Sequence, residues 1–318
     1  MEISEMKKQL KLPVVMAPMF LISNPEMVVN ACKAGIVGSF PALNARTTEL
    51  LDKWMAEINA ELEQENSAPW AINFISHRSN KRFLEDLQLI GKHQPPIVIT
   101  SLGDPSPVVD VVHDYGGLVF SDVINVKFAK KAIKKGSDGL VLVANGAGGH
   151  GGTLNPIAFV HEVRSFFEGP IMLAGAMSRG EDILAAEVLG ADFAYMGTHF
   201  ITAAEGAAGE DYRQMAIDSN VEDIVYTPAF SGIPANYLAP SIVRSGLDPT
   251  DLPEKGKIDF SELGNPNVRA WKDIYGAGQG VGGIGEVRPV AGIIQELLAE
   301  YTEAQQKIVQ RYQAMVNN

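Results

Sequence analysis

Eight short apolar runs, each followed by a stretch of helical character, constrain the fold of this chain more than any other feature of its sequence. The runs begin at Pro13, Gly35, Trp70, Pro95, Gly117, Gly139, Pro170 and Phe193. They are nearly continuous in apolar residues and do not alternate with polar ones, as is typical of parallel strands that are covered on both faces. Eight such strands alternating with helices predict an α/β fold, a (β/α)8 TIM barrel.

The segments between and after the runs predict the domain organisation. Residues 47–62 and 179–190 have helical patterns, and a long helix is expected from about Val290 to Met315. The pattern weakens after the eighth run, where a long stretch is dense in Pro and Gly. We therefore expect a barrel formed by residues 1–202 and about 268–318, with a small cap or lid subdomain of about 203–267 inserted after strand eight.

The charge of the chain excludes some classes of partner. Its 318 residues include 26 Lys and Arg against 38 Asp and Glu, which gives a formal net charge of −12 at pH 7. We expect no binding to nucleic acid or to an anionic membrane through a basic surface. The only cysteine, Cys32, cannot form an intrachain disulfide, and no cluster of residues has metal-ligand spacing. We therefore expect no metal site.

The distribution of apolar residues favours a cytoplasmic protein. The N-terminus has scattered charges and lacks the apolar region of a secretory signal. The longest uncharged stretch, residues 139–160, contains six glycines and is expected to be a strand with a glycine loop, not a membrane span.

Small residues at the carboxyl ends of the runs suggest a ligand site, because those ends form the functional face of a (β/α)8 barrel. The residues there are Ala17, Pro18, Met19, Asn73, Ser101, Asp122, Gly175, Ala176, Gly197 and Thr198. Small side chains let the main chain approach a large flat ligand, and backbone N–H groups near Gly175 and Gly197 could bind a phosphate. These features predict a phosphorylated cofactor such as flavin mononucleotide (FMN).

Two glycine spacings imitate the fingerprint of dinucleotide-binding loops. The first, in residues 146–151, follows a strand, but the next helix is expected to begin only at Asn155–Pro156 and no acidic residue closes a second strand about 20 residues on. The second, in residues 278–283, follows no strand. A Rossmann-type site is therefore disfavoured.

His150 is the strongest candidate for chemistry. Glycines flank it on both sides, in residues 148–149 and 151–152, and offer no side chains against which an imidazole could pack. A histidine at the mouth of a barrel in such a segment is better placed for proton transfer or substrate binding than for packing. A structural role is favoured for the other histidines, His77, His93, His113, His161 and His199.

Several of these segments, in the order in which they occur, resemble the nitronate monooxygenase family, formerly called 2-nitropropane dioxygenases. The resemblance is carried by residues 17–19 (APM), 72–74 (INF), 147–152 (AGGHGG), 174–177 (AGAM), 196–200 (MGTHF) and 276–280 (GAGQG). It implies a barrel that bears FMN, a lid after strand eight, and His150 as the catalytic base. The FMN contacts that it implies are Ala17, Pro18, Met19, Asn73, Asp122, Ala147, Gly148, Gly149, Gly175, Ala176, Gly197, Thr198 and Gln279.

Three positions depart from the pattern of that family. It usually has Glu shortly before AGGH, where this chain has Asn145, and AGGI after strand seven, where this chain has AGAM. It usually offers Gln or Lys after strand five, where Asp122 stands. An acid beside a flavin would disfavour an anionic reduced ring, so these departures bear on redox tuning and not on the fold.

The resemblance implies an oxidoreductase that uses FMN and O2 to convert alkyl nitronates into a carbonyl compound and nitrite. His150 would then deprotonate the neutral nitroalkane or bind the anion. Two alternatives stay open: an NAD(P)H-dependent flavin reductase of an enoyl thioester or a quinone, and an FMN-binding barrel without turnover. The sequence does not name the small-molecule substrate. It also leaves the oligomeric state open, so the protein could be a homodimer.

Overall fold

All eight predicted runs form strands of one parallel sheet in the computed structural model, which describes residues 3–63, 67–77, 79–252 and 272–316. The strands are β1 (Val14–Met16), β2 (Gly38–Pro41), β3 (Trp70–Ile75), β4 (Ile97–Ser101), β5 (Leu118–Val123), β6 (Gly139–Val143), β8 (Ile171–Ala174) and β9 (Phe193–Met196). Their order is β1-β9-β8-β6-β5-β4-β3-β2, and every neighbouring pair is parallel.

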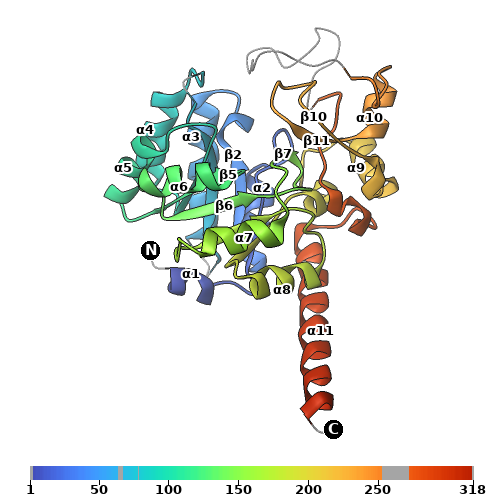
Figure 1. Ribbon diagram of the computed structural model, residues 1–318. Helices are drawn as coiled ribbons and strands as arrows, with labels where there is room; N and C mark the ends of the chain where they lie inside the picture. The colour runs from blue at the N-terminus through green and yellow to red at the C-terminus, as the bar shows by residue number, and fades with distance from the viewer. Residues whose placement is uncertain (1–2, 64–66, 78, 253–271, 317–318) are drawn as a thin grey trace.

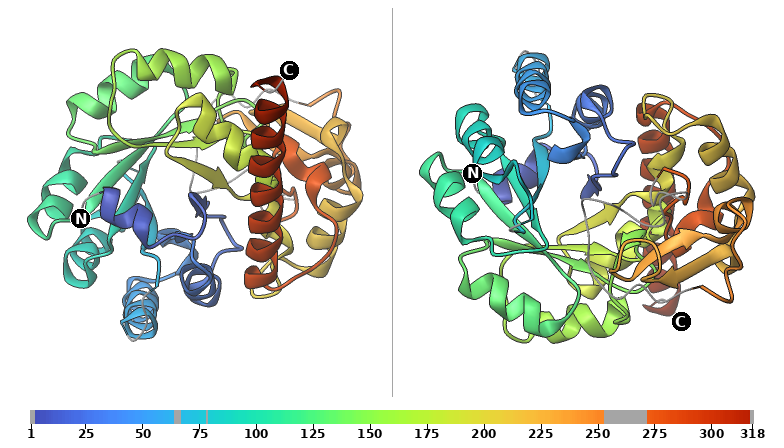
Figure 2. Two further views of the ribbon diagram at one scale, coloured as in Figure 1. Left: turned by 90° about the horizontal axis from the view of Figure 1, so that it is seen from below. Right: turned by 90° about the horizontal axis from the view of Figure 1, so that it is seen from above.

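Backbone hydrogen bonds nearly close this sheet on itself. The Met16 N–H donates to the Val37 carbonyl at 2.8 Å, and the Val37 N–H donates to the Val14 carbonyl at 3.1 Å. The view from above in Figure 2 shows the strands arranged around a central axis with the helices outside them. The predicted (β/α)8 barrel is therefore confirmed.

Helices cover the outer face of the barrel (Figure 1). They are α2 (Pro25–Ala34), α3 (Thr48–Leu62), α4 (Phe83–His93), α5 (Ser106–Asp114), α6 (Val126–Lys134), α7 (Pro156–Arg164), α8 (Gly180–Leu189) and α11 (Val290–Val316). Thr47 caps α3 by accepting a hydrogen bond from the Leu50 N–H, and Gly190 ends α8 with a left-handed φ of 103°. The helices predicted at residues 47–62, 179–190 and from Val290 are thus confirmed.

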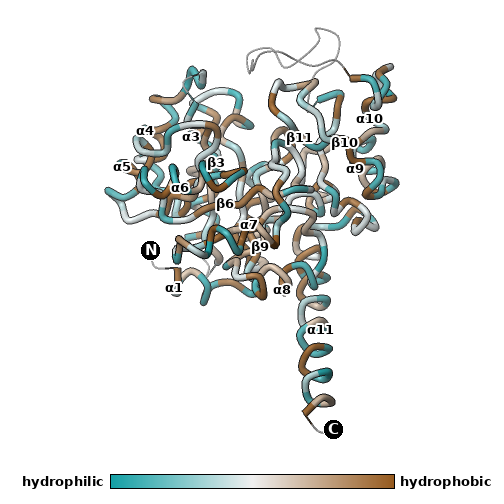
Figure 3. The backbone as a smooth tube through the Cα atoms, viewed as in Figure 1, coloured by the Kyte–Doolittle hydropathy of each residue, from teal (hydrophilic) through white to brown (hydrophobic). Residues whose placement is uncertain are grey.

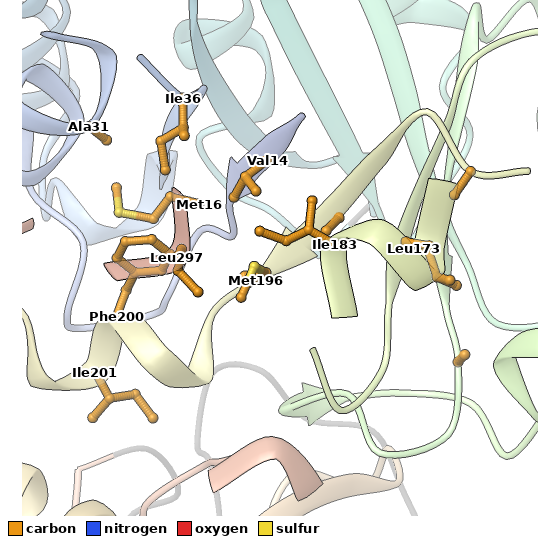
Figure 4. Packing of buried hydrophobic residues seen from close by; sticks show 14 of the residues in the cluster. Val14, Met16, Ala31, Ile36, Leu173, Ile183, Met196, Phe200, Ile201 and Leu297 are labelled. Atoms are coloured by element: carbon orange, nitrogen blue, oxygen red, sulfur yellow. The ribbon is translucent and has the colours of Figure 1, made fainter. Parts of the chain in front are cut away.

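The N-terminal helix and the long C-terminal helix complete the barrel. Helix α1 (Ile3–Lys8) places Met6 in the apolar cluster inside the barrel, at the end opposite the strand carboxyl termini. The first turns of α11 pack on the barrel, where Leu297 lies beside Met16 and Phe200 (Figure 4). The rest of α11 extends beyond the body of the protein (Figure 1). None of the helices in the described part of the chain combines the length and the apolar character that crossing a bilayer requires.

Strand residues alternate between the inside of the barrel and the surrounding helices. Val15 belongs to the inner cluster, whereas its neighbours Val14 and Met16 pack towards the helices. In the same way Val141 faces inwards and Leu140 outwards, so β6 is apolar along most of its length (Figure 3). This alternation decides which residues near the strand ends face the site.

The eighth run is shorter as a strand than the sequence predicts. Strand structure was expected from Phe193 through Phe200, but β9 ends at Met196 and the chain continues as a 3-10 helix, η2 (Thr198–Thr202). The apolar residues of η2 are buried, and a short buried run has the same composition whether it is a strand or a helix.

The segment after β9 forms a small antiparallel sheet with helices. It contains α9 (Glu210–Asp218), η3 (Val221–Asp223), β10 (Ile224–Thr227), β11 (Ala235–Leu238) and α10 (Ala239–Arg244). Two other short helices are η1 (Ala42–Asn44) and η4 (Gln279–Gly283). The division into a barrel and a cap of about 203–267 stays a prediction, and residues 253–267 of that cap lie outside the described residues.

Candidate active site

A cavity of about 810 Å³ lies at the carboxyl ends of the barrel strands. All the site residues predicted from the sequence line it except Gln279: these are Ala17, Pro18, Met19, Asn73, Asp122, Ala147, Gly148, Gly149, His150, Gly175, Ala176, Gly197 and Thr198. The structure therefore brings together residues from six different strand ends. Gln279 lies behind the wall, where its N–H donates to the Gly146 carbonyl at 2.9 Å.

Two glycine segments pack against each other to form this wall. A Cβ atom on Gly148 would lie 2.9 Å from the Gly278 nitrogen, and a Cβ atom on Gly278 would lie 2.6 Å from the Gly146 oxygen. The Gly278 N–H donates to Thr198 Oγ1 at 2.9 Å. Gly278 thus serves close backbone packing.

His150 belongs to both the barrel and the small sheet. Gly149 and His150 form strand β7, which pairs antiparallel with β11 so that His150 lies opposite Ala235. The Asn236 amide donates to the Ala147 carbonyl at 2.7 Å, and the Tyr226 hydroxyl donates to the Gly151 carbonyl at 2.8 Å. The segment after β9 therefore holds the loop on both sides of the imidazole.

A buried serine of the segment after β9 contacts the His150 ring. The His150 Nε2 lies 2.9 Å from Ser231 Oγ, and the Ser231 hydroxyl donates to the Ile233 carbonyl at 2.9 Å. When the hydroxyl proton of Ser231 is directed at that carbonyl, its oxygen accepts from a protonated Nε2, and Nδ1 is then the basic nitrogen. Sequence reasoning missed Ser231, because it lies in a Pro- and Gly-rich segment without a motif.

Burial sets the charge of this histidine. It lowers the pKa of His150 to about 4, from an ordinary value of 6.5, because the imidazolium form loses its hydration. The ring is therefore neutral at pH 7. It can accept a proton, but it does not offer a positive charge to an anion.

Comparisons with known proteins identify the family of this chain. The sequence pattern of the family described as "Nitronate monooxygenase" matches residues 3–300. The chain belongs to the nitronate monooxygenase family. It is accordingly an oxidoreductase of that family. Members of this family typically depend on a flavin.

Two relatives show the extent of the similarity. A nitronate monooxygenase of Paraburkholderia phytofirmans is 28% identical over 278 residues, which cover 74% of this chain and 76% of the relative. A nitronate monooxygenase of Neurospora crassa is 25% identical over 349 aligned positions, which cover 93% of this chain and 90% of the relative.

Two solved structures share the fold. FabK from Thermotoga maritima has a TM-score of 0.78 at 21% identity, with 97% of this chain and 98% of that chain covered. A nitroalkane oxidase from Streptomyces ansochromogenes has a TM-score of 0.80 at 21% identity, with 95% and 99% covered. At these identities the likeness establishes the fold of this nitronate monooxygenase family member and nothing finer.

The floor of the cavity is a layer of polar side chains above the apolar interior of the barrel. Ala71, Ile99, Phe120 and Phe193 belong to the inner cluster. Two residues further along the same strands stand Asn73, Ser101, Asp122 and Tyr195, which line the cavity. Sequence reasoning missed Tyr195. The signal was its position two residues after Phe193 on one strand, because alternate residues of a strand point to the same face of the sheet.

Three of these floor residues form a chain of hydrogen bonds. The Asn73 amide donates to Ser101 Oγ at 2.7 Å, and the Ser101 hydroxyl donates to Asp122 Oδ2. Burial raises the pKa of Asp122 to about 6, against the lowering effect of the Ser101 hydrogen bond. The position that departs from the family pattern is thus a carboxyl group with an unusually high proton affinity.

One residue of the predicted phosphate-binding backbone has an unexpected conformation. Ala176 has a left-handed φ of 57°, at the position where the family usually has a second glycine, and its N–H donates to the Gly146 carbonyl at 3.3 Å. The N–H groups of Gly175, Gly197 and Thr198 make no hydrogen bond to another described residue. They are therefore backbone donors in this wall that a ligand could use.

Three of the remaining histidines have local partners outside the cavity. His199 is buried, and its Nδ1 lies 2.8 Å from the Ser178 carbonyl, outside the cavity wall. His93 contacts Asp52, and His113 contacts Asp138 at 2.9 Å. Across residues 3–63, 67–77, 79–252 and 272–316, no three His, Cys, Asp or Glu side chains gather closely enough to hold a metal ion.

Proposed function

We propose that this protein uses FMN and O2 to oxidise alkyl nitronates to a carbonyl compound and nitrite. The observation that carries the proposal is His150, a neutral imidazole held by Ser231 in the wall of a cavity at the strand carboxyl ends. Membership of the nitronate monooxygenase family supports the same reaction.

The residues around the cavity fit FMN. Gly175, Gly197 and Thr198 supply backbone donors suited to one terminal phosphate. Ala17, Gly148 and Gly149 expose main chain to a flat ring, and the buried Asp122 Oδ1 lacks a hydrogen-bond partner among the described residues. When bound, FMN supplies the redox chemistry, and the protein supplies binding and proton transfer.

His150 acts as a base in this proposal. With Nε2–H directed at Ser231, Nδ1 accepts the proton that the neutral nitroalkane loses from carbon. Its neutral state at pH 7 argues against the other role that the sequence left open, which is binding the nitronate anion through a positive charge. Apolar side chains of Met19, Phe20 and Met177 line the cavity and suit the alkyl part of the substrate.

Two substrates separate these roles. We expect His150→Asn to keep flavin and to lose turnover of a neutral nitroalkane by about 10²–10⁴-fold, the usual size of general-base catalysis. Turnover of pre-formed nitronate should fall much less, because no proton remains to be removed. Equal losses on both substrates would mean that His150 positions a ligand and is not a base.

The cofactor and the electron donor are tested directly. Mass analysis of the released chromophore should give FMN, and FAD or no flavin after reconstitution would contradict the proposal. In anaerobic stopped-flow mixing, ethyl nitronate should bleach the flavin absorbance, whereas NADH and NADPH should not. Bleaching by a nicotinamide alone would instead establish the flavin reductase activity.

A further inference from the structure

Asp122 has one carboxylate oxygen that the protein leaves unsatisfied. Oδ2 accepts the Ser101 hydroxyl, whereas Oδ1 is buried and has no hydrogen-bond partner in the described part of the chain. A buried polar atom without a partner costs about 1–3 kcal/mol, so such an atom beside a cavity indicates a missing ligand.

The hydrogen-bond chain decides where a proton on Asp122 would reside. Ser101 Oγ accepts from the Asn73 amide at 2.7 Å, so the Ser101 hydroxyl proton is directed at Asp122 Oδ2. Oδ2 is therefore already an acceptor, and the proton of a neutral Asp122 belongs on Oδ1. Because the terminal torsion of an aspartate is soft, Oδ1 can turn towards a ligand in the cavity while Oδ2 keeps Ser101.

The surroundings of Asp122 offer little to hold a negative charge. The titratable residues among the described cavity lining are Tyr195 from β9, Lys131 from α6, Asp104 after β4, His150 from β7, Tyr212 from α9 and Tyr226 from β10. Burial and the Ser101 hydrogen bond are the influences that set the pKa of Asp122, and burial prevails. Burial and the Asp122 charge together raise the pKa of Tyr195, so this neighbour remains a neutral phenol.

We infer that Asp122 binds the flavin ring as a neutral carboxylic acid, with Oδ1 donating a hydrogen bond to an acceptor atom of the ring. The inference rests on the proposed function, because it takes FMN as the occupant of the cavity. The ring has carbonyl oxygens and nitrogens that accept hydrogen bonds and one N–H that donates. An ionised Asp122 would be repelled beside one of the acceptors and held beside the N–H, and the two cases give flavin affinity opposite pH dependences. With an acceptor as its partner, the protein selects flavin through the protonated form of Asp122.

This selection makes flavin affinity depend on pH with a defined sign. If the ligand binds only protonated Asp122, affinity is fully present below the pKa of about 6 and is lost as the pH rises above it. Between pH 6 and pH 8 the dissociation constant should then rise by about 50-fold through Asp122 alone. The FMN phosphate, with a pKa of about 6, also titrates in this range, so a comparison with a variant is needed.

Asp122→Asn is the decisive variant. Because the Ser101 hydroxyl donates to this position, the side-chain carbonyl of the introduced amide replaces Oδ2 as its acceptor. The NH2 group of the amide then replaces Oδ1, and it is a donor that does not ionise. We expect the ratio of wild-type to variant FMN dissociation constants, measured by fluorescence quenching, to rise by about 50-fold from pH 6 to pH 8. The control Asp104→Asn removes another acid of the cavity lining, whose pKa the Ser106 N–H and Lys135 hold at about 2. The ratio of the wild-type to the Asp104→Asn dissociation constant should be the same at pH 6 and pH 8.

A measurement on the wild-type protein alone guards against a poorly folded variant. Calorimetric binding of FMN at pH 8, in buffers of different ionisation enthalpy, should show uptake of about one proton, because the phosphate is already a dianion there. No proton uptake, or parallel pH profiles of the wild type and Asp122→Asn, would overturn the inference and leave the proposed function intact. Failure of both proteins to bind any flavin at every pH would overturn the proposed function and the inference with it.

Discussion

Removing the Ser231 hydroxyl tests whether the cap segment sets the chemistry of His150. Ser231 is fully buried, and its Oγ is 2.9 Å from His150 Nε2 and 2.9 Å from the Ile233 carbonyl. A single neutral hydrogen bond contributes about 0.5–1.5 kcal/mol, and about 1.4 kcal/mol corresponds to tenfold. In Ser231→Ala, the population of the tautomer with a basic Nδ1 should therefore fall by about 2- to 12-fold relative to the other.

The assay compares two substrates. Turnover of a neutral nitroalkane should fall by at most that factor, because it follows the fraction of the active tautomer, whereas turnover of pre-formed nitronate should stay close to that of the wild type. The loss of a donor to the partly buried Ile233 carbonyl should also lower the free energy of unfolding by about 0.5–1.5 kcal/mol, which a chemical denaturation curve measures.

Ser241→Ala is the matched control. Ser241 is also fully buried in the segment after β9, and its hydroxyl donates to the Leu238 carbonyl at 2.7 Å. It should show a similar loss of stability with no change in the ratio of nitroalkane to nitronate turnover. The reasoning is refuted if Ser231→Ala leaves that ratio unchanged, or if Ser241→Ala shifts it equally.

Three further predictions concern pH and the backbone of the site. For the neutral nitroalkane, kcat/KM should stay level as the pH falls to about 5 and drop only near the His150 pKa of about 4, because only the neutral imidazole accepts a proton; an acid limb near 6.5 would contradict the burial argument. Gly148→Ala should lower the melting temperature and weaken flavin retention, because its Cβ would lie 2.9 Å from the Gly278 nitrogen; an unchanged melting temperature would show that the two loops can separate freely. Ala176→Gly should stabilise the protein by about 0.5–1 kcal/mol in denaturant titration by relieving the left-handed φ of 57°, and a loss of stability would refute the strain.

The strands were predictable from the sequence because each is a continuous apolar run long enough to stand out. The end of β9 was not, because Phe200 and Ile201 are as apolar in a buried 3-10 helix as they would be in a strand. Strand β7 has only two residues, and its partner β11 lies more than 80 residues later in the chain, so no local pattern could reveal it.

The cavity wall was likewise predictable where strand ends carry small residues, since the barrel brings all those ends to one face. What the sequence could not provide were the groups that tune the chemistry. Ser231 reaches His150 through the pairing of β7 with β11, and the proton affinity of Asp122 follows from burial, which depends on the packed structure. Gln279 is the opposite case. It belongs to a segment that matches the family pattern, but it does not line the cavity and instead supports the wall through its hydrogen bond to Gly146.

The pairing of β7 with β11 has a mechanical consequence. An outward swing of β10 and β11 would pull on His150 through its backbone, through Ser231 and through the Asn236 contact to Ala147. The proposed proton acceptor would be withdrawn by the same movement. The geometry for proton transfer at His150 therefore depends on β10 and β11 staying in place, although neither strand belongs to the barrel.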